Sequence, residues 1–231
     1  PNELRKLTFT LVLASFSVGF ALNALVPSMT LVRQVFKSNV ANTNWALTAS
    51  LLAAAVSLPI TGRYGDTRGK KKVFQFLLAC GIFGSVLATV STSLAMLIVS
   101  RVFQGISLGT VSLGMSILQD GEDTGNRTRS IAIVGSGFGL GGAVALPLAA
   151  LLNQNDNWRA IFWFSATILI TSFYLSFESI PKRAHSTRER FDVVGSVTLA
   201  IALTGIILAI SKIVTGDWSK LLVYGVLLTS S

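Results

Sequence analysis

Long apolar runs alternate with short polar segments along the whole chain. A helix that crosses a bilayer needs about 20 consecutive, mostly apolar residues. The runs predict helices over residues 7–31, 44–61, 73–92, 94–119, 130–152, 160–177 and 193–214, with a truncated helix that starts near residue 221. The runs are solidly apolar rather than alternating with a period of two, which disfavours a β-barrel. The pattern therefore predicts an all-α membrane protein.

Composition supports a lipid environment. The chain is 51% hydrophobic and 13% charged, whereas soluble domains carry about 25% charged residues. The net charge of +9 would suit nucleic-acid binding, but the cations lie in short segments between apolar runs, so we expect a bilayer and no nucleic acid as partner. The single Cys80 lies in an apolar run and excludes a disulfide framework. The sequence predicts no metal and no cofactor.

The distribution of Lys and Arg predicts the orientation. With the amino terminus in the cytoplasm, thirteen of the nineteen Lys and Arg residues fall in cytoplasmic segments, five fall at outer ends, and Arg101 lies inside a helix. Because cytoplasmic loops carry the excess of positive charge, we expect a multi-pass protein of the plasma (cell inner) membrane with a cytoplasmic amino terminus. Trp45, Trp158 and Trp218 fall at predicted outer ends, which predicts an interfacial aromatic belt.

A glycine-punctuated basic loop is predicted over residues 62–72, with five cations in eleven residues. Glycines allow tight turns. The one acid of the loop lies just ahead of the third predicted helix, where it could interact with the positive helix end. The candidate gating residues are Gly62, Gly65, Asp66, Gly69, Lys70 and Lys71. The alternative interpretation is a turn that only sets topology.

Arg101 is the only charged residue well inside a predicted helix. An intramembrane cation is costly and normally faces the protein interior or a water-filled cavity, and we favour the cavity. The alternative is that its long side chain reaches the outer interface. Asn23 and Gln104 could hydrogen-bond to it, so we hypothesise a polar spot of Arg101, Asn23 and Gln104 beside Gly105.

Glycines crowd the fifth predicted helix between residues 135 and 142. They resemble a dinucleotide-binding turn, but no alternation of strands and helices surrounds them. Glycines let helices approach closely in a membrane, so Gly135, Gly139, Gly142 and the nearby Pro147 are predicted to serve helix packing.

Several motifs together resemble the major facilitator superfamily, and specifically its fourteen-helix drug:proton antiporters. They are Gly62-x-x-Gly65-Asp66-x-x-Gly69-Lys70-Lys71, Arg101-x-x-Gln104-Gly105, Asn23-x-x-x-Pro27, Trp158-Arg159-x-x-Phe162 and Phe191-Asp192-x-x-Gly195. The resemblance implies a six-helix bundle of 3+3 inverted repeats over residues 1–178, a basic cytoplasmic linker over 179–191, and one full and one truncated extra helix over 192–231. It also implies that a carboxy-terminal half is missing and is the partner of this bundle.

The resemblance implies alternating access, with proton-coupled efflux of small molecules or drugs as the leading function. It assigns gating to the basic loop and proton coupling to Arg101. Two departures weaken the antiporter assignment: Val18 stands where many drug antiporters carry an acid, and Pro147-Leu148-Ala149-Ala150 replaces a proline followed by paired glycines. The alternatives are uptake or facilitated exchange of a polar metabolite without proton coupling and, less favoured, a membrane scaffold or enzyme. One histidine, one cysteine and no deep carboxylate argue against an enzyme.

Overall fold

A computed structural model describes residues 2–120, 124–153 and 157–181, together with Thr198, Ala202 and Gly205, which are helical. The chain divides into two compact units, Pro1–Arg188 and Glu189–Ser231. Apart from these three residues, the extra helices predicted over residues 192–231 fall outside the described residues, as does most of the linker predicted over 179–191. The helices and turns from residue 2 to residue 181 all belong to the first unit.

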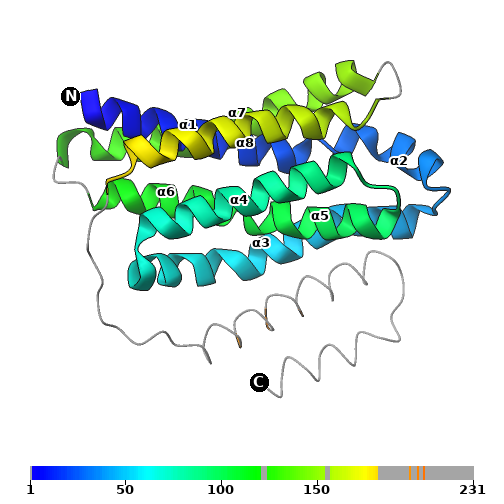
Figure 1. The fold of residues 1–231 in the computed structure, drawn as a ribbon, viewed down its shortest axis with the longest axis horizontal. Helices are drawn as coiled ribbons and strands as arrows, with labels where there is room; N and C mark the ends of the chain where they lie inside the picture. The colour runs from blue at the N-terminus through cyan, green and yellow to red at the C-terminus, as the bar shows by residue number, and fades with distance from the viewer. Residues whose placement is uncertain are drawn as a thin grey trace. The chain divides into compact units, whose positions relative to one another are not determined.

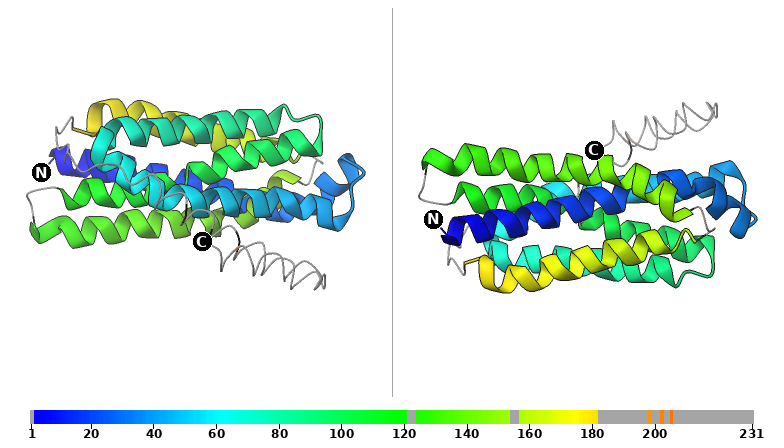
Figure 2. Two further views of the ribbon diagram at one scale, coloured as in Figure 1. Left: turned by 90° about the horizontal axis from the view of Figure 1, so that it is seen from below. Right: turned by 90° about the horizontal axis from the view of Figure 1, so that it is seen from above.

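Helices of the first unit lie side by side, nearly along one axis (Figure 1; Figure 2). In chain order the elements are α1 (Asn2–Asn23), η1 (Val26–Ser28), α2 (Met29–Val35), α3 (Val40–Arg68), α4 (Lys70–Thr89), α5 (Leu94–Ile106), α6 (Gly109–Gln119), α7 (Thr124–Leu152) and α8 (Ala160–Ser179). Within the described residues they form six stretches long and apolar enough to cross a membrane, at the predicted places. The prediction of an all-α membrane protein is confirmed.

The elements repeat in length. The six stretches fall into two sets of three in chain order. The first stretch of each set is broken into two helices, α1 with α2 in the first set and α5 with α6 in the second. The second is a helix of 29 residues with an internal proline, Pro59 in α3 and Pro147 in α7. The third is a helix of 20 residues, α4 or α8. Such internal repeats are common in transporter folds.

Three differences from the prediction bear on the candidate site. The first helix stops at Asn23, because Pro27 cannot continue the hydrogen-bonding pattern of an α-helix. The fourth breaks near its middle, at Ser107 and Leu108. The loop predicted over residues 62–72 is almost entirely helical, and only Gly69 lies between α3 and α4. Its φ of 94° lies in the region that favours glycine.

Backbones of α1 and α7 approach each other through glycines. A Cβ atom added to Gly19 would collide with the carbonyl of Phe138, and one added to Gly141 would collide with the carbonyl of Phe16. Close approach of this kind requires glycine, as is typical of membrane helices.

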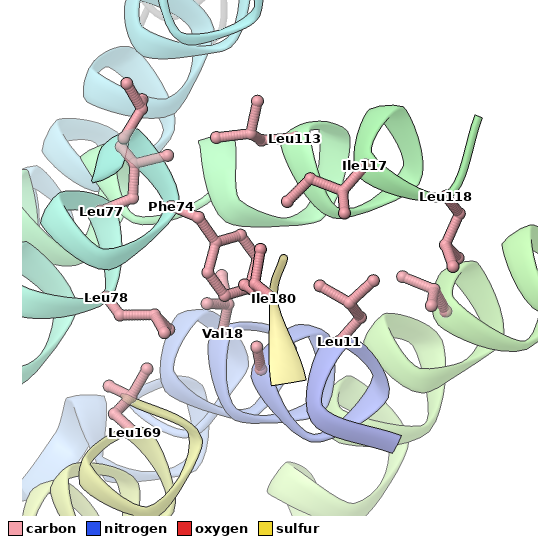
Figure 3. Close-up of a cluster of buried hydrophobic side chains, with 13 residues drawn as sticks. Leu11, Val18, Phe74, Leu77, Leu78, Leu113, Ile117, Leu118, Leu169 and Ile180 are labelled. Atoms are coloured by element: carbon pink, nitrogen blue, oxygen red, sulfur yellow. The ribbon is translucent and has the colours of Figure 1, made fainter. Parts of the chain in front are cut away.

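An apolar core surrounds α1. It contains residues of α1, α4, α6, α7 and α8, with Ile180 directly after α8. Figure 3 shows Val18 within this cluster, together with Phe74 and Ile180. Val18 is fully buried. The position where a drug antiporter would carry an acid is therefore a packed apolar site in this protein.

The tryptophan belt is not observed as predicted. Trp45 is exposed, but only 1% of Trp158 is accessible. Trp158 packs edge-on against Phe36 and Phe162, and Arg159 lies 4.8 Å from its ring centroid. Trp158 thus contributes to the core rather than to an interface, and Trp218 lies outside the described residues.

Candidate functional site

Arg101 lies at the centre of a buried polar network. Its side chain is completely inaccessible to solvent, so the predicted placement facing a water-filled cavity is not observed in this structure. A buried cation is costly unless its donors are satisfied. The cost is offset here by hydrogen bonds that reach three helices.

Each of the five guanidinium N–H groups has its own acceptor. Nε donates to the carbonyl of Ala46 at 3.3 Å. Nη1 donates to the carbonyl of Ala21 at 2.8 Å and to Oε1 of Gln104. Nη2 donates to the carbonyl of Leu22 at 2.9 Å and to Oγ of Ser50 at 3.4 Å. None of these acceptors is a carboxylate, so the charge is stabilised by neutral dipoles alone.

The end of α1 supplies two of these dipoles. Ala21 and Leu22 belong to the last turn of α1, and the last four carbonyls of a helix have no partner within it. The carboxyl end of a helix also carries partial negative charge. The early end of α1 at Asn23 therefore creates a site for a cation, and Arg101 fills it.

Gly105 and Gly84 set the distances in the network. A Cβ atom added to Gly105 would collide with the carbonyl of Ser50 on α3, and one added to Gly84 would lie 2.7 Å from the carbonyl of Ser100 on α5. These glycines bring α5 against both α3 and α4. Gly105 therefore acts by letting α5 pack closely against α3. It lies one helical turn after Arg101 and so helps to position the arginine.

Gln104 extends the network from α5 to α4 and α8. Its Oε1 accepts from Arg101, and its Nε2 donates to Oγ of Ser85 at 3.0 Å. Ser85 and Ser165 are paired at 3.4 Å. The structure thus brings Gln104 together with Arg101, as hypothesised from the sequence.

Asn23 does not join this network. Its Nδ2 donates to the carbonyl of Gly19 in its own helix at 2.9 Å, and a Cβ atom on Gly142 would lie 3.0 Å from the same nitrogen. The hypothesis of an Arg101–Asn23 hydrogen bond is therefore wrong, because the guanidinium donates to the carbonyls of Ala21 and Leu22 instead.

The predicted gating residues form a helical corner at what we call the basic end of the bundle: the α3–α4 junction, the start of α1, the end of α6 and the end of α8. Lys70 Nζ lies 3.5 Å from Asp66 and 2.7 Å from Asp120, at the end of α6. From the sequence, Asp66 could interact with the positive end of the following helix. It lies instead in the last turn of α3, and no side chain caps α4.

Glycines at this corner differ in role. Gly65 is buried against Leu113 of α6, Gly69 makes the turn, and Gly62 has open space where a side chain would stand. Lys71 Nζ donates to the carbonyls of Phe177 and Ile180, both at 2.6 Å. Lys70 and Lys71 therefore tie the corner to the ends of α6 and α8, within the same bundle.

The predicted packing glycines of α7 are only partly the ones that pack. Gly137 and Gly141 meet the backbone of α1, whereas a Cβ on Gly135 would approach only the end of the Met115 side chain. Gly139 has nothing within 4 Å, so its predicted packing role is wrong within this bundle. Pro147 lies on the exposed surface of α7.

Sequence reasoning missed Ser50, Ser85, Ser165 and the backbone acceptors of Arg101. Serines are frequent in this chain, and most buried ones bond to their own helix. Backbone carbonyls carry no signal in the sequence at all. Among the described residues, no group of three His, Cys, Asp or Glu side chains could hold a metal ion.

The described residues thus form a six-span helical bundle with a buried arginine and a charged helical corner. The sequence profile of the Major Facilitator Superfamily matches residues 11–230. The chain therefore belongs to the major facilitator superfamily, and it is a multi-pass membrane protein.

Relatives and structural neighbours differ in what they are named for. A triacylglyceride transporter of Mycolicibacterium smegmatis is 32% identical over 68% of this chain and 29% of its own length. Multidrug resistance protein 3 of Bacillus subtilis is 24% identical over 78% of this chain and 36% of its own length. The human organic anion transporter MFSD10 has a similar fold, with a TM-score of 0.67 at 21% identity, over 89% of this chain and 55% of that one. The chain thus spans about a third of the length of these two relatives.

Proposed function

We propose that this chain is the amino-terminal bundle of a secondary transporter that exports small molecules by alternating access. The observation that carries the proposal is the completely buried, completely paired Arg101 in a bundle of this superfamily. The name of the multidrug relative supports export, because it is a resistance protein. The carboxy-terminal bundle of the same protein would supply the other half of the substrate path.

Protons are the proposed coupling ion, but every described Asp and Glu lies at or next to a helix end rather than deep in a span. Arg101 does not titrate in the physiological range, and Val18 occupies the position where an acid is common in the drug antiporters. The proposal therefore places the proton-binding carboxylate outside the described helices. Facilitated exchange without protons is the second candidate, and the all-neutral surroundings of Arg101 favour it.

The basic end is proposed to face the cytoplasm of a plasma (cell inner) membrane and to serve as the gate. The pairing of Lys70 with Asp66 and Asp120 supports this role, because the corner would have to move with the ends of α3, α4 and α6. Gly62, Gly65, Gly69 and Lys71 belong to the same gate.

Transport can be tested in inverted membrane vesicles that contain the intact protein. When the vesicle lumen is made more acidic than the outside, we expect ethidium to accumulate in the lumen. The Arg101→Met variant should lose this accumulation. Accumulation that follows the ethidium gradient alone, with no response to the pH gradient, would favour facilitated exchange. Ethidium and other cationic and neutral probes that all fail to accumulate in wild-type vesicles would contradict small-molecule export.

A further inference from the structure

Ser85 and Ser165 differ from most other buried serines of the bundle. Ser17, Ser57, Ser100 and Ser107 each donate to a carbonyl of their own helix, as buried serines in helices often do. Ser85 of α4 and Ser165 of α8 are fully inaccessible, yet their hydroxyl partners lie on other helices. Their hydroxyl groups therefore join helices instead of satisfying local backbone.

Arg101 gives this chain of hydrogen bonds a direction. Its Nη1–H requires an acceptor, so the amide oxygen of Gln104 faces the cation and the amide nitrogen must donate elsewhere. That nitrogen donates to Oγ of Ser85. The hydroxyl proton of Ser85 is then available to Ser165, 3.4 Å away. Hydrogen bonds arranged in one direction polarise and strengthen each other.

We propose that Ser85 and Ser165 are positioning residues for Arg101. Their hydroxyl pair holds the amide of Gln104, and this amide holds one edge of the guanidinium. Through this chain α8 takes part in orienting Arg101, although it accepts none of the hydrogen bonds that Arg101 donates. The role in transport rests on the proposed function, but the effect on Arg101 itself does not.

The position of the serine pair makes it a route from the α4–α8 pair to the arginine. At the basic end, Lys71 of α4 donates to carbonyls at the end of α8. At the opposite end, Arg159 before α8 donates to the carbonyl of Ser91 just after α4, at 2.9 Å. The two helices are thus bound at both ends. A shift of this pair reaches Gln104 through Ser85, which lies between the two ends, in addition to the packing of Gly84 against α5.

Hydrogen exchange of the Arg101 side chain tests the proposal without any transport assay. In protein labelled with ¹⁵N-arginine, the protected Nε–H signal is assigned to Arg101 by its absence in Arg101→Lys. Ser85→Ala and Ser165→Ala are expected to accelerate its exchange by about fivefold or more, the effect of losing one net hydrogen bond. Ser85→Cys, of similar volume and with a weak hydrogen-bonding group, is the second variant should Ser85→Ala fail to fold.

Ser172→Ala is the matched control. Ser172 is as buried as Ser165 on the same helix, but its hydroxyl donates to the carbonyl of Ile168 within α8. Exchange at Arg101 should stay at the wild-type rate in this variant. Equal acceleration in all three alanine variants, or in none, would overturn the proposal. If Arg101 responds as expected while transport of the intact protein is unaffected, the proposed function of Arg101 fails and the positioning role stands.

Discussion

At the scale of single residues, Arg101 and Val18 are the two most informative positions, and their surroundings are of opposite kinds: polar around Arg101 and apolar around Val18. Arg101 places a positive charge inside a predicted membrane helix, where burial costs free energy. Every N–H donor of its guanidinium has an acceptor, which offsets this cost. Val18 is apolar where the resemblance to drug antiporters implies an acid, and it is packed into the core. The sequence identified both positions but not their surroundings, because the acceptors of Arg101 are mostly backbone carbonyls.

Replacing Arg101 by lysine should destabilise the protein although the charge is kept. An ammonium has three donors and a guanidinium has five, so at least two buried acceptors lose their partners, at about 1–3 kcal/mol each. Melting can be followed by the reaction of a fluorogenic maleimide with Cys80, which is buried and is the only cysteine of this chain. Arg5→Lys, at an exposed position, is the control and should melt like the wild type. Equal melting of Arg101→Lys and Arg5→Lys would contradict the network.

Val18→Asp should be far more damaging than Val18→Ala. Alanine removes only apolar contacts, at about 0.5–3 kcal/mol, whereas the carboxyl group would be buried among leucines and Phe74 without a partner. The two variants can be compared by the same Cys80 melting experiment. If Val18 faced water, both variants would melt at similar temperatures, and the packed position described above would be wrong.

At the scale of helices, the apolar runs predicted the spans well because lipid leaves few alternatives to a continuous helix. The breaks were not predicted. The break after Asn23 depends on Pro27 together with Arg101, which takes the freed carbonyls, and the break at Ser107 has no proline. The continuation of α3 to Arg68 was missed because glycines and cations look like a loop when helix contacts are unknown. Lys70 and Lys71 find partners on α6 and α8 that only the fold brings near.

Two glycines of α7 offer a matched test of helix packing. Gly141→Ala would force α1 and α7 apart, because the added methyl meets the backbone of Phe16 and Phe20. We expect a loss of stability of about 1–3 kcal/mol, visible as a lower melting temperature. Gly139→Ala meets open space and should be neutral or stabilising by up to about 1 kcal/mol, because alanine favours helix. The reverse order of the two melting temperatures would contradict the α1–α7 contact.

At the scale of the whole molecule, the proposed orientation places the basic end in the cytoplasm. Cys80→Ala removes the single cysteine of this chain, and cysteines elsewhere in the intact protein are replaced as well. In that background, Asn42→Cys at the opposite end should react with an impermeant maleimide added to intact cells. Lys72→Cys at the basic end should react only after permeabilisation. Both residues are exposed, so the opposite labelling pattern would overturn the orientation.

The order of Arg101 and its acceptors along the chain has a consequence for how the protein is made. Ala21, Leu22, Ala46 and Ser50 are all synthesised before α5, and Gln104 belongs to α5 itself. An arginine at the centre of an isolated inserting helix costs about 2.5–3.5 kcal/mol. Here α5 can pack against α1 and α3 as it leaves the translocon. These helices already present the carbonyl and hydroxyl acceptors of Arg101. Only Ser165 is synthesised later, so we expect insertion of α5 to depend on the helices before it and not on α8.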